Sequence, residues 1–133
     1  MTERTIEEVM ALAPVIPVLT IERVEDAVPL AQALVKGGLA ALEITLRTDA
    51  ALDAIAAISK AVPDAVPGVG TVTTVDDLNK ARAAGAQFAV SPGFAVDLVE
   101  AAAGLPYLPG IATASEAMAA QRAGLSCLKF FPA

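Results

Sequence analysis

The chain has 133 residues, of which 56% are hydrophobic, and this is enough for one compact domain with a sizeable core. Its net charge of −6 argues against nucleic acid or an anionic membrane surface as the main partner. One cysteine and no histidine exclude a disulfide framework and the usual zinc and haem sites, so we expect no metal, no cofactor and a cytoplasmic setting.

The N-terminal residues do not have the pattern of a targeting signal. The stretch MTERTIEEVMALA is acidic and amphipathic, which predicts a helix over residues 2–12 rather than a signal peptide. No stretch reaches the roughly 18 uninterrupted apolar residues that a membrane-spanning helix needs. We therefore expect a soluble protein that does not act at a membrane.

After this helix, short apolar strands alternate with amphipathic helices. Strands are expected at residues 15–20, 39–47, 65–72, 87–91, 105–111 and 126–131. The helices expected between them cover residues 20–38, 48–62, 73–86, 95–104 and 113–125, and most end at a glycine. Strands that alternate with helices pair in parallel through right-handed crossovers. The sequence therefore predicts a single α/β domain over residues 1–133.

The ends of the expected helices carry further signals. Thr74 with Asp77 and Thr113 with Glu116 have the spacing of capping boxes. Pro29 has no N–H group, so it should kink the first long helix or delay its start.

The charged residues on the expected strands are unusual, because parallel strands are normally buried on both faces. They are Glu43, Arg47 and Lys129. Alternation places Glu43 and Arg47 on one face of their strand, while Lys129 shares a face with Cys127 and Phe131. We infer that these polar faces meet in a barrel interior or cleft. The alternative is a buried Glu–Lys ion pair with a surface arginine, although desolvation makes such pairs weak stabilisers.

These residue types fit imine chemistry on a 2-oxo acid. Desolvation or a nearby cation lowers the pKa of an amine, and a neutral lysine amine attacks a ketone to form a Schiff base. The protonated imine withdraws electrons, so a neighbouring C–C bond can break without a free carbanion. Lys129 would supply this amine, Glu43 would move protons, and Arg47 would hold the substrate carboxylate by a bidentate fork.

Longer segments around these residues form a pattern along almost the whole chain. In order, they are VIPVLTIERVEDAVPLAQALVKGG, LEITLRT, GVGTV, GAQFAVSPG, LPGIAT and LKFFPA. This pattern resembles that of the 2-keto-3-deoxy-6-phosphogluconate (KDPG) aldolases, which are also active on 4-hydroxy-2-oxoglutarate. The LEITLRT and KFFPA segments are specific, whereas glycine-rich strand ends such as GVGTV occur in many α/β proteins.

The resemblance implies a class I aldolase, a lyase that cleaves KDPG to pyruvate and glyceraldehyde 3-phosphate. It implies that Lys129 forms the Schiff base and that Glu43 is the general acid and base, acting through a water. Arg47 and Thr71 would hold the pyruvate carboxylate, and Phe131 would line the pocket. The implied partner is a small 2-oxo acid, and no cofactor is implied.

Several of these residues also have purely structural interpretations. Thr71 could be a strand-end hydroxyl or a helix cap, and Phe131 could be plain core. Pro92 is a candidate pocket wall, although a structural role in its strand-to-helix turn is the stronger interpretation. Gly68 and Gly70 could let the backbone approach a ligand, or they could serve turn geometry.

The fold implied by the resemblance is a TIM (β/α)8 barrel of roughly 200 residues, in which loops after strands seven and eight bind phosphate. This chain would be a partial barrel, truncated after its sixth strand, with phosphate recognition weakened more than imine chemistry. Its first and last strands would need cover from a neighbouring subunit, from tighter closure of the sheet or from a separate polypeptide. We favour self-association, because the resemblance implies a homotrimer.

Two other functions stay open. The chain could be a catalytically impaired remnant that serves as a scaffold or oligomer subunit, or it could bind small oxo acids without catalysis. Trapping of a pyruvate imine on Lys129 by borohydride would separate the aldolase from both.

Overall fold

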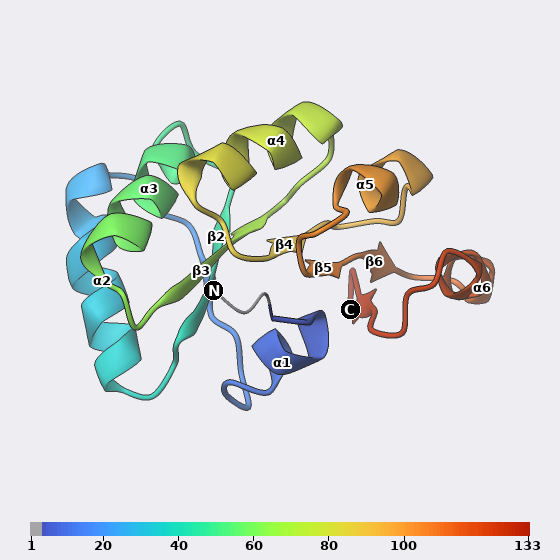
Figure 1. Cartoon of the computed structure of the whole chain (residues 1–133), viewed down its shortest axis with the longest axis horizontal. Coiled ribbons are helices and arrows are strands. Elements are labelled where there is room, and N and C mark those ends of the chain that lie inside the picture. Colours follow the sequence, from blue (N-terminus) through green and yellow to red (C-terminus); the bar gives the residue numbers. More distant parts are fainter. Residues whose placement is uncertain (1–3) are drawn as a thin grey trace.

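The computed structural model describes residues 4–133, in which helices alternate with parallel strands (Figure 1). The helices are α1 (Ile6–Met10), α2 (Val24–Lys36), α3 (Ala51–Ala61), α4 (Val75–Ala84), α5 (Val96–Ala101) and α6 (Ala114–Arg122). The strands are β1 (Val18–Leu19), β2 (Ala41–Thr45), β3 (Val66–Gly70), β4 (Ala89–Val90), β5 (Tyr107–Leu108), β6 (Gly110–Ile111) and β7 (Lys129–Phe130). The α/β alternation expected from the sequence is confirmed. Over these residues no helix has both the length and the apolar character needed to cross a membrane.

The strands form two parallel sheets. Strands β1 to β5 lie side by side in chain order, and β6 pairs with β7 in a separate two-stranded sheet. The β2–β3 ladder runs over the full length of both strands and places Glu43 opposite Gly68 and Thr45 opposite Gly70. Neighbours in sequence are thus neighbours in space, as in the wall of a (β/α) barrel.

The single strand expected at 105–111 is wrong, because Pro109 divides it into β5 and β6. Proline has no N–H group and cannot donate to a ladder. The carbonyl of Pro109 instead accepts a hydrogen bond from the N–H of Lys129 at 2.9 Å. The chain therefore stops pairing with β4 at this proline and pairs with β7 beyond it.

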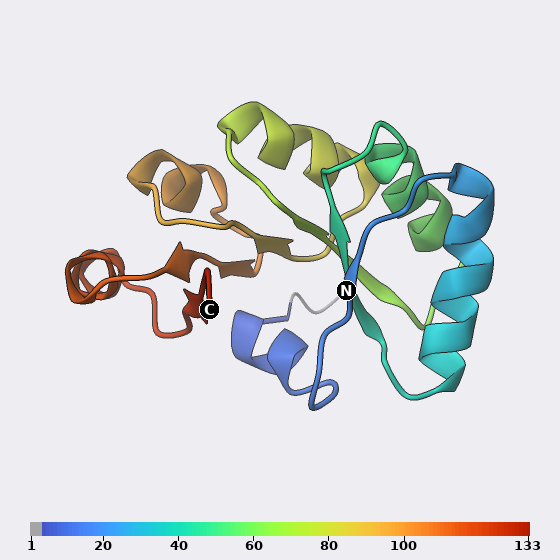
Figure 2. The same cartoon turned by 180° about the vertical axis from the view of Figure 1, so that it is seen from behind.

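Two apolar clusters pack against the five-stranded sheet, one on each face. Leu42 and Ile44 of β2 belong to a larger cluster with α2, α3, α4 and α5. Ala41, one residue earlier, belongs to a smaller cluster with Val9 of α1 and with Phe88. Figures 1 and 2 show α2 to α5 along one side of the strands and α1 on the other. Each fully buried Leu or Ile side chain contributes about 1.5–3 kcal/mol of transfer free energy.

The helix ends follow local hydrogen-bonding rules. Thr74 and Asp77 form the expected capping box at the start of α4. At α6 the Thr113 side chain accepts from the N–H of Glu116 at 3.2 Å, as expected. The reciprocal bond differs, because the Glu116 carboxylate accepts from the hydroxyl of Thr113 at 2.8 Å. Only the first of the two expected boxes is therefore complete.

The N-terminal helix begins later than the sequence predicted. Thr5 and Glu8 form a capping box that starts α1 at Ile6. Residues 2 and 3 of the expected helix lie outside the described residues. The later long helix α2 begins at Val24, before Pro29, so the proline lies in the helix interior and does not set its start.

Candidate active site

Glu43 lies on the face of β2 opposite to the outer helices. Leu42 and Ile44 pack toward those helices, so alternation directs Glu43 and Thr45 to the other face. Glu43 is only 5% exposed. The buried hydroxyl of Thr45 donates to the carbonyl of Leu19 at 2.9 Å. The carboxylate of Glu43, in contrast, makes no hydrogen bond to any residue within 4–133.

Lys129 approaches Glu43 from the last strand, β7. Its Nζ atom lies 3.9 Å from Oε1 of Glu43. The same nitrogen lies 4.8 Å from the centre of the Phe131 ring, which is a cation–π distance. Two segments far apart in the sequence therefore bring an amine, a carboxylate and an aromatic face together. The inference that the two polar faces meet is confirmed.

The amine is less enclosed than the sequence suggested. The Lys129 side chain is 26% exposed rather than fully buried. It lies on a two-residue strand that pairs with β6 and with no other strand among residues 4–133. The neighbouring Phe130 and Phe131 are 63% and 37% exposed. The interpretation of Phe131 as plain core is therefore wrong.

The environment of Glu43 changes its acidity. Burial raises the pKa of this carboxyl group, while the positive charges of Lys129 and then Arg47 act in the opposite direction, and the net pKa is raised. A carboxyl group with a raised pKa exchanges its proton closer to neutral pH. This is the property that general acid–base catalysis uses.

Arg47 and Thr71 follow the carboxyl ends of β2 and β3. Arg47 is exposed and forms no salt bridge with the described part of the chain, so its guanidinium is available to a ligand. Thr71 has a φ of 61°, which a β-branched residue rarely adopts. Such strain concentrates at functional sites. The helix-cap interpretation of Thr71 is wrong, because the N-cap of α4 is Thr74.

Pro92 packs against Gly110 of β6, the strand that pairs with the amine-bearing strand β7. Its carbonyl packs so closely on Gly110 that a β-carbon on the glycine would collide with it. Gly110 is in turn the ladder partner of Lys129. Pro92 also lines a hollow of about 220 Å³, but neither Glu43 nor Lys129 does. The structure thus connects Pro92 to the pair through β6.

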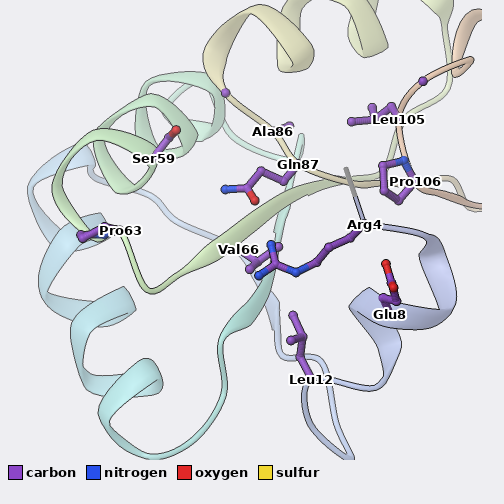
Figure 3. Close-up of a pocket in the computed structure, with 12 residues that line it drawn as sticks. Arg4, Glu8, Leu12, Ser59, Pro63, Val66, Ala86, Gln87, Leu105 and Pro106 are labelled. Carbon is purple, nitrogen blue, oxygen red and sulfur yellow. The ribbon is translucent and has the colours of Figure 1, made fainter. Parts of the chain in front are cut away.

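A larger hollow, of about 1050 Å³, lies at the opposite end of the strands (Figure 3). Its wall includes Arg4, Val66 at the start of β3, and Gln87 just before β4. Neither Glu43 nor Lys129 lines it. We place the candidate site at the amine–carboxylate pair, because parallel α/β folds bind ligands at the carboxyl ends of their strands.

Two glycines of β3 have a role that the sequence did not reveal. A β-carbon on Gly70 would collide with the carboxyl group of Glu43, and one on Gly68 would collide with the ring of Phe88. The space that each glycine leaves is filled by a neighbouring side chain rather than kept open for a ligand. In the sequence, Gly68 and Gly70 are visible only as two glycines at alternate positions. Which side chains pack against them depends on the strand register.

A buried hydroxyl pair that sequence reasoning also missed holds the turn after β4. The hydroxyl of Ser91 donates to the carbonyl of Gly93 at 2.6 Å. The Tyr107 hydroxyl lies 2.6 Å from Ser91 Oγ and therefore acts as the donor between them. Burial raises the pKa of Tyr107. These residues are 16 positions apart, and their identities alone did not indicate the contact.

Comparisons with known proteins agree with this geometry. A family model described as KDPG and KHG aldolase matches residues 6–133. The chain is 50% identical to the 2-dehydro-3-deoxy-phosphogluconate aldolase of Dickeya dadantii over 129 residues, which is 96% of this chain and 61% of that protein. It is 52% identical to the Treponema pallidum protein of the same name over 97% of this chain and 62% of that protein.

Solved structures give the same result. The KDPG aldolase of Legionella pneumophila, with pyruvate captured at low pH as a covalent carbinolamine intermediate, matches with a TM-score of 0.95 and 42% identity. The match covers 99% of this chain and 65% of the Legionella chain. The chain thus spans less than two thirds of the length of these relatives, and it shares their TIM-barrel-like α/β fold. It belongs to the KDPG and KHG aldolase family.

Proposed function

We propose that this chain carries the Schiff-base chemistry of a class I aldolase that cleaves KDPG to pyruvate and glyceraldehyde 3-phosphate. The observation that supports this most directly is the 3.9 Å approach of Lys129 Nζ to Glu43 Oε1. An amine next to a carboxylate of raised pKa can form an imine while its neighbour moves protons.

The proposed reaction begins with attack of the neutral Lys129 amine on the C2 carbonyl of the substrate. The oxygen takes one proton from the attacking nitrogen and one from the Glu43 carboxyl group and leaves as water, which gives a protonated imine. The Glu43 carboxylate then removes the proton of the C4 hydroxyl, and the C3–C4 bond breaks. Its electron pair moves into the imine to give an enamine, and the aldehyde leaves. Protonation of the enamine at C3 and hydrolysis of the imine release pyruvate and restore the amine.

The remaining site residues have binding roles in this proposal. Arg47 and Thr71, which follow neighbouring strand ends, would hold the substrate carboxylate. The ring of Phe131 would cover the reacting carbon next to Lys129. Pro92 would form the wall behind β6. The guanidinium of Arg47 suits this task because it binds a carboxylate with two parallel hydrogen bonds.

The substrate class is supported by the relatives. Proteins about half identical to this chain are named 2-dehydro-3-deoxy-phosphogluconate aldolase or KHG/KDPG aldolase. The Legionella structure holds pyruvate as a covalent carbinolamine. We therefore propose KDPG as the substrate, with 4-hydroxy-2-oxoglutarate as a second one. The named residues hold the 2-oxo acid end, and no described residue is assigned to the phosphate.

Borohydride trapping tests this proposal. The protein is incubated with pyruvate, reduced with borohydride and measured by mass spectrometry, and we expect one reduced pyruvate adduct on Lys129. Lys129→Ala should abolish the adduct. Lys80→Ala is the matched control, because Lys80 lies exposed on α4 in a salt bridge with Asp76, and this variant should keep the adduct.

Other outcomes would overturn the proposal. An adduct that persists in Lys129→Ala would place the imine elsewhere. Saturable pyruvate binding without a trapped adduct would instead support a non-catalytic binder of oxo acids. Absence of both, in a protein that still assembles, would support a scaffold or oligomer subunit.

We also propose that residues 1–133 act as one domain that self-associates, as a trimer, in the cytoplasm. Val18 on β1 and Phe130 on β7 support self-association, because they are 51% and 63% exposed at the ends of the two sheets. Apolar side chains on strand edges are usually covered in a stable protein. Sedimentation equilibrium would contradict this if the protein remained monomeric at micromolar concentration.

A further inference from the structure

The position of the Glu43 carboxyl group depends on a residue that has no side chain. Gly70 ends β3, and a β-carbon built on it would lie 2.7 Å from Cγ and 2.8 Å from Cδ of Glu43, with Oε1 closer still. Real β-carbons do not approach other atoms so closely. We infer that Gly70 is a positioning residue, which seats the Glu43 carboxyl group beside Lys129. This inference rests on the acid–base role proposed for Glu43.

Within the described residues, no hydrogen bond fixes the position of the Glu43 carboxyl group. The carboxylate of Glu43 makes none, and its ion pair with Lys129 is long, at 3.9 Å. Thr45, the next residue on the same face, shows the contrast, because its hydroxyl is fixed by the carbonyl of Leu19. Packing against the backbone of β3 is therefore what determines where the Glu43 carboxyl group lies.

Backbone conformation does not explain the glycine. Among residues 4–133 the glycines with positive φ are Gly38, Gly85, Gly104 and Gly124, and Gly70 is not one of them. Alanine can adopt the backbone conformation of Gly70 without the strain of a left-handed φ. The consequence of a Gly70→Ala substitution is therefore the collision of its methyl group with Glu43.

This collision should affect proton transfer more than imine formation. A displacement of about 1 Å at a catalytic group can cost roughly 100-fold in rate. We expect Gly70→Ala to slow the exchange of pyruvate methyl protons with deuterium oxide by about that factor, measured by NMR. Because Lys129 is unchanged, borohydride should still trap pyruvate on it.

A double-mutant cycle with Glu43→Ala separates positioning from general damage. Once Glu43 is shortened, the methyl group that Gly70→Ala adds has room. Gly70→Ala should then slow exchange no further, and its effect on the urea midpoint of unfolding should largely disappear. A Gly70→Ala variant that exchanges within two-fold of wild type would overturn the inference. So would an equal shift of the urea midpoint in both backgrounds.

Gly68→Ala is the matched control, because Gly68 lies on the same face of β3 but contacts Phe88. Its shift of the urea midpoint should be the same whether residue 43 is Glu or Ala. The unfolding cycle needs no enzymatic activity. It therefore tests whether Gly70 positions the Glu43 carboxyl group even if borohydride traps no adduct. A missing adduct would count against the proposed function and not against this positioning role.

Discussion

Glu43 connects the stability of the fold to pH. Burial raises its pKa above the ordinary value of 4.5, so the folded state keeps the proton at pH values where the unfolded chain has released it. The stabilising contribution of this group is therefore fully present below pH 4.5 and is lost as the pH rises through the raised pKa of Glu43. We expect the free energy of unfolding to fall with pH in this window, through this residue.

The difference between wild type and Glu43→Gln isolates that contribution. Glutamine resembles the protonated acid, so the variant should lack this pH dependence and should be at least as stable as wild type at neutral pH. Urea unfolding over a range of pH gives both curves. Asp53→Asn, on the exposed face of α3, controls for the change in net charge. A difference that grows in favour of wild type as the pH rises would contradict the expected sign.

The meeting of Glu43 and Lys129 could be predicted because buried parallel strands rarely carry charged residues unless those residues pair or serve a site. The 26% exposure of Lys129 could not be predicted, because it depends on which other segments pack over β7. The role of Gly70 could not be predicted either. It follows from the register that pairs Thr45 with Gly70 and from the direction in which the Glu43 side chain leans, and neither is visible in one sequence.

At the scale of single elements, the capping box of α4 provides a quantitative test. The side chain of Thr74 accepts from the N–H of Asp77 at 3.1 Å, while the Asp77 carboxylate accepts from the N–H of Thr74 at 3.3 Å. Thr74→Ala removes the first bond and should lower the free energy of unfolding by about 1 kcal/mol. Thr74→Ser keeps the hydroxyl and should stay near wild type in the same urea titration. Equal losses in the two variants would contradict a capping role.

The helices and strands were predictable in kind because their signals are local. Apolar spacing, caps and terminal glycines lie within a few residues of each element, as at Gly85, whose φ of 105° ends α4. Strand ends were less predictable, because a ladder depends on which neighbour is in reach. Pro109 illustrates this. Its missing N–H was visible in the sequence, but the change of partner from β4 to β7 was not.

At the scale of the whole molecule, the two faces of the sheet have different tasks. The outer face is packed by α2 to α5 and contributes stability. On the other face lie Glu43 and a small apolar cluster that includes Phe88 and Val9. The large hollow opens at the far end, and its existence was not predictable, since segments as distant as Arg4 and Pro106 line it. Stability and chemistry therefore share one sheet but occupy separate regions of it.

Phe88 provides the test of this division. Its ring is fully buried on Gly68, beneath the site and in contact with the α1 cluster. Phe88→Ala should lower the free energy of unfolding by about 3–5 kcal/mol, because the apolar contacts are lost and a cavity is left. Phe130→Ala makes the same chemical change on a ring that is 63% exposed, and it should alter protomer stability by less than about 0.5 kcal/mol. Urea unfolding measured at two protein concentrations separates protomer stability from self-association. Similar losses in the two variants at both concentrations would mean that the cluster around Phe88 does not hold the inner face together.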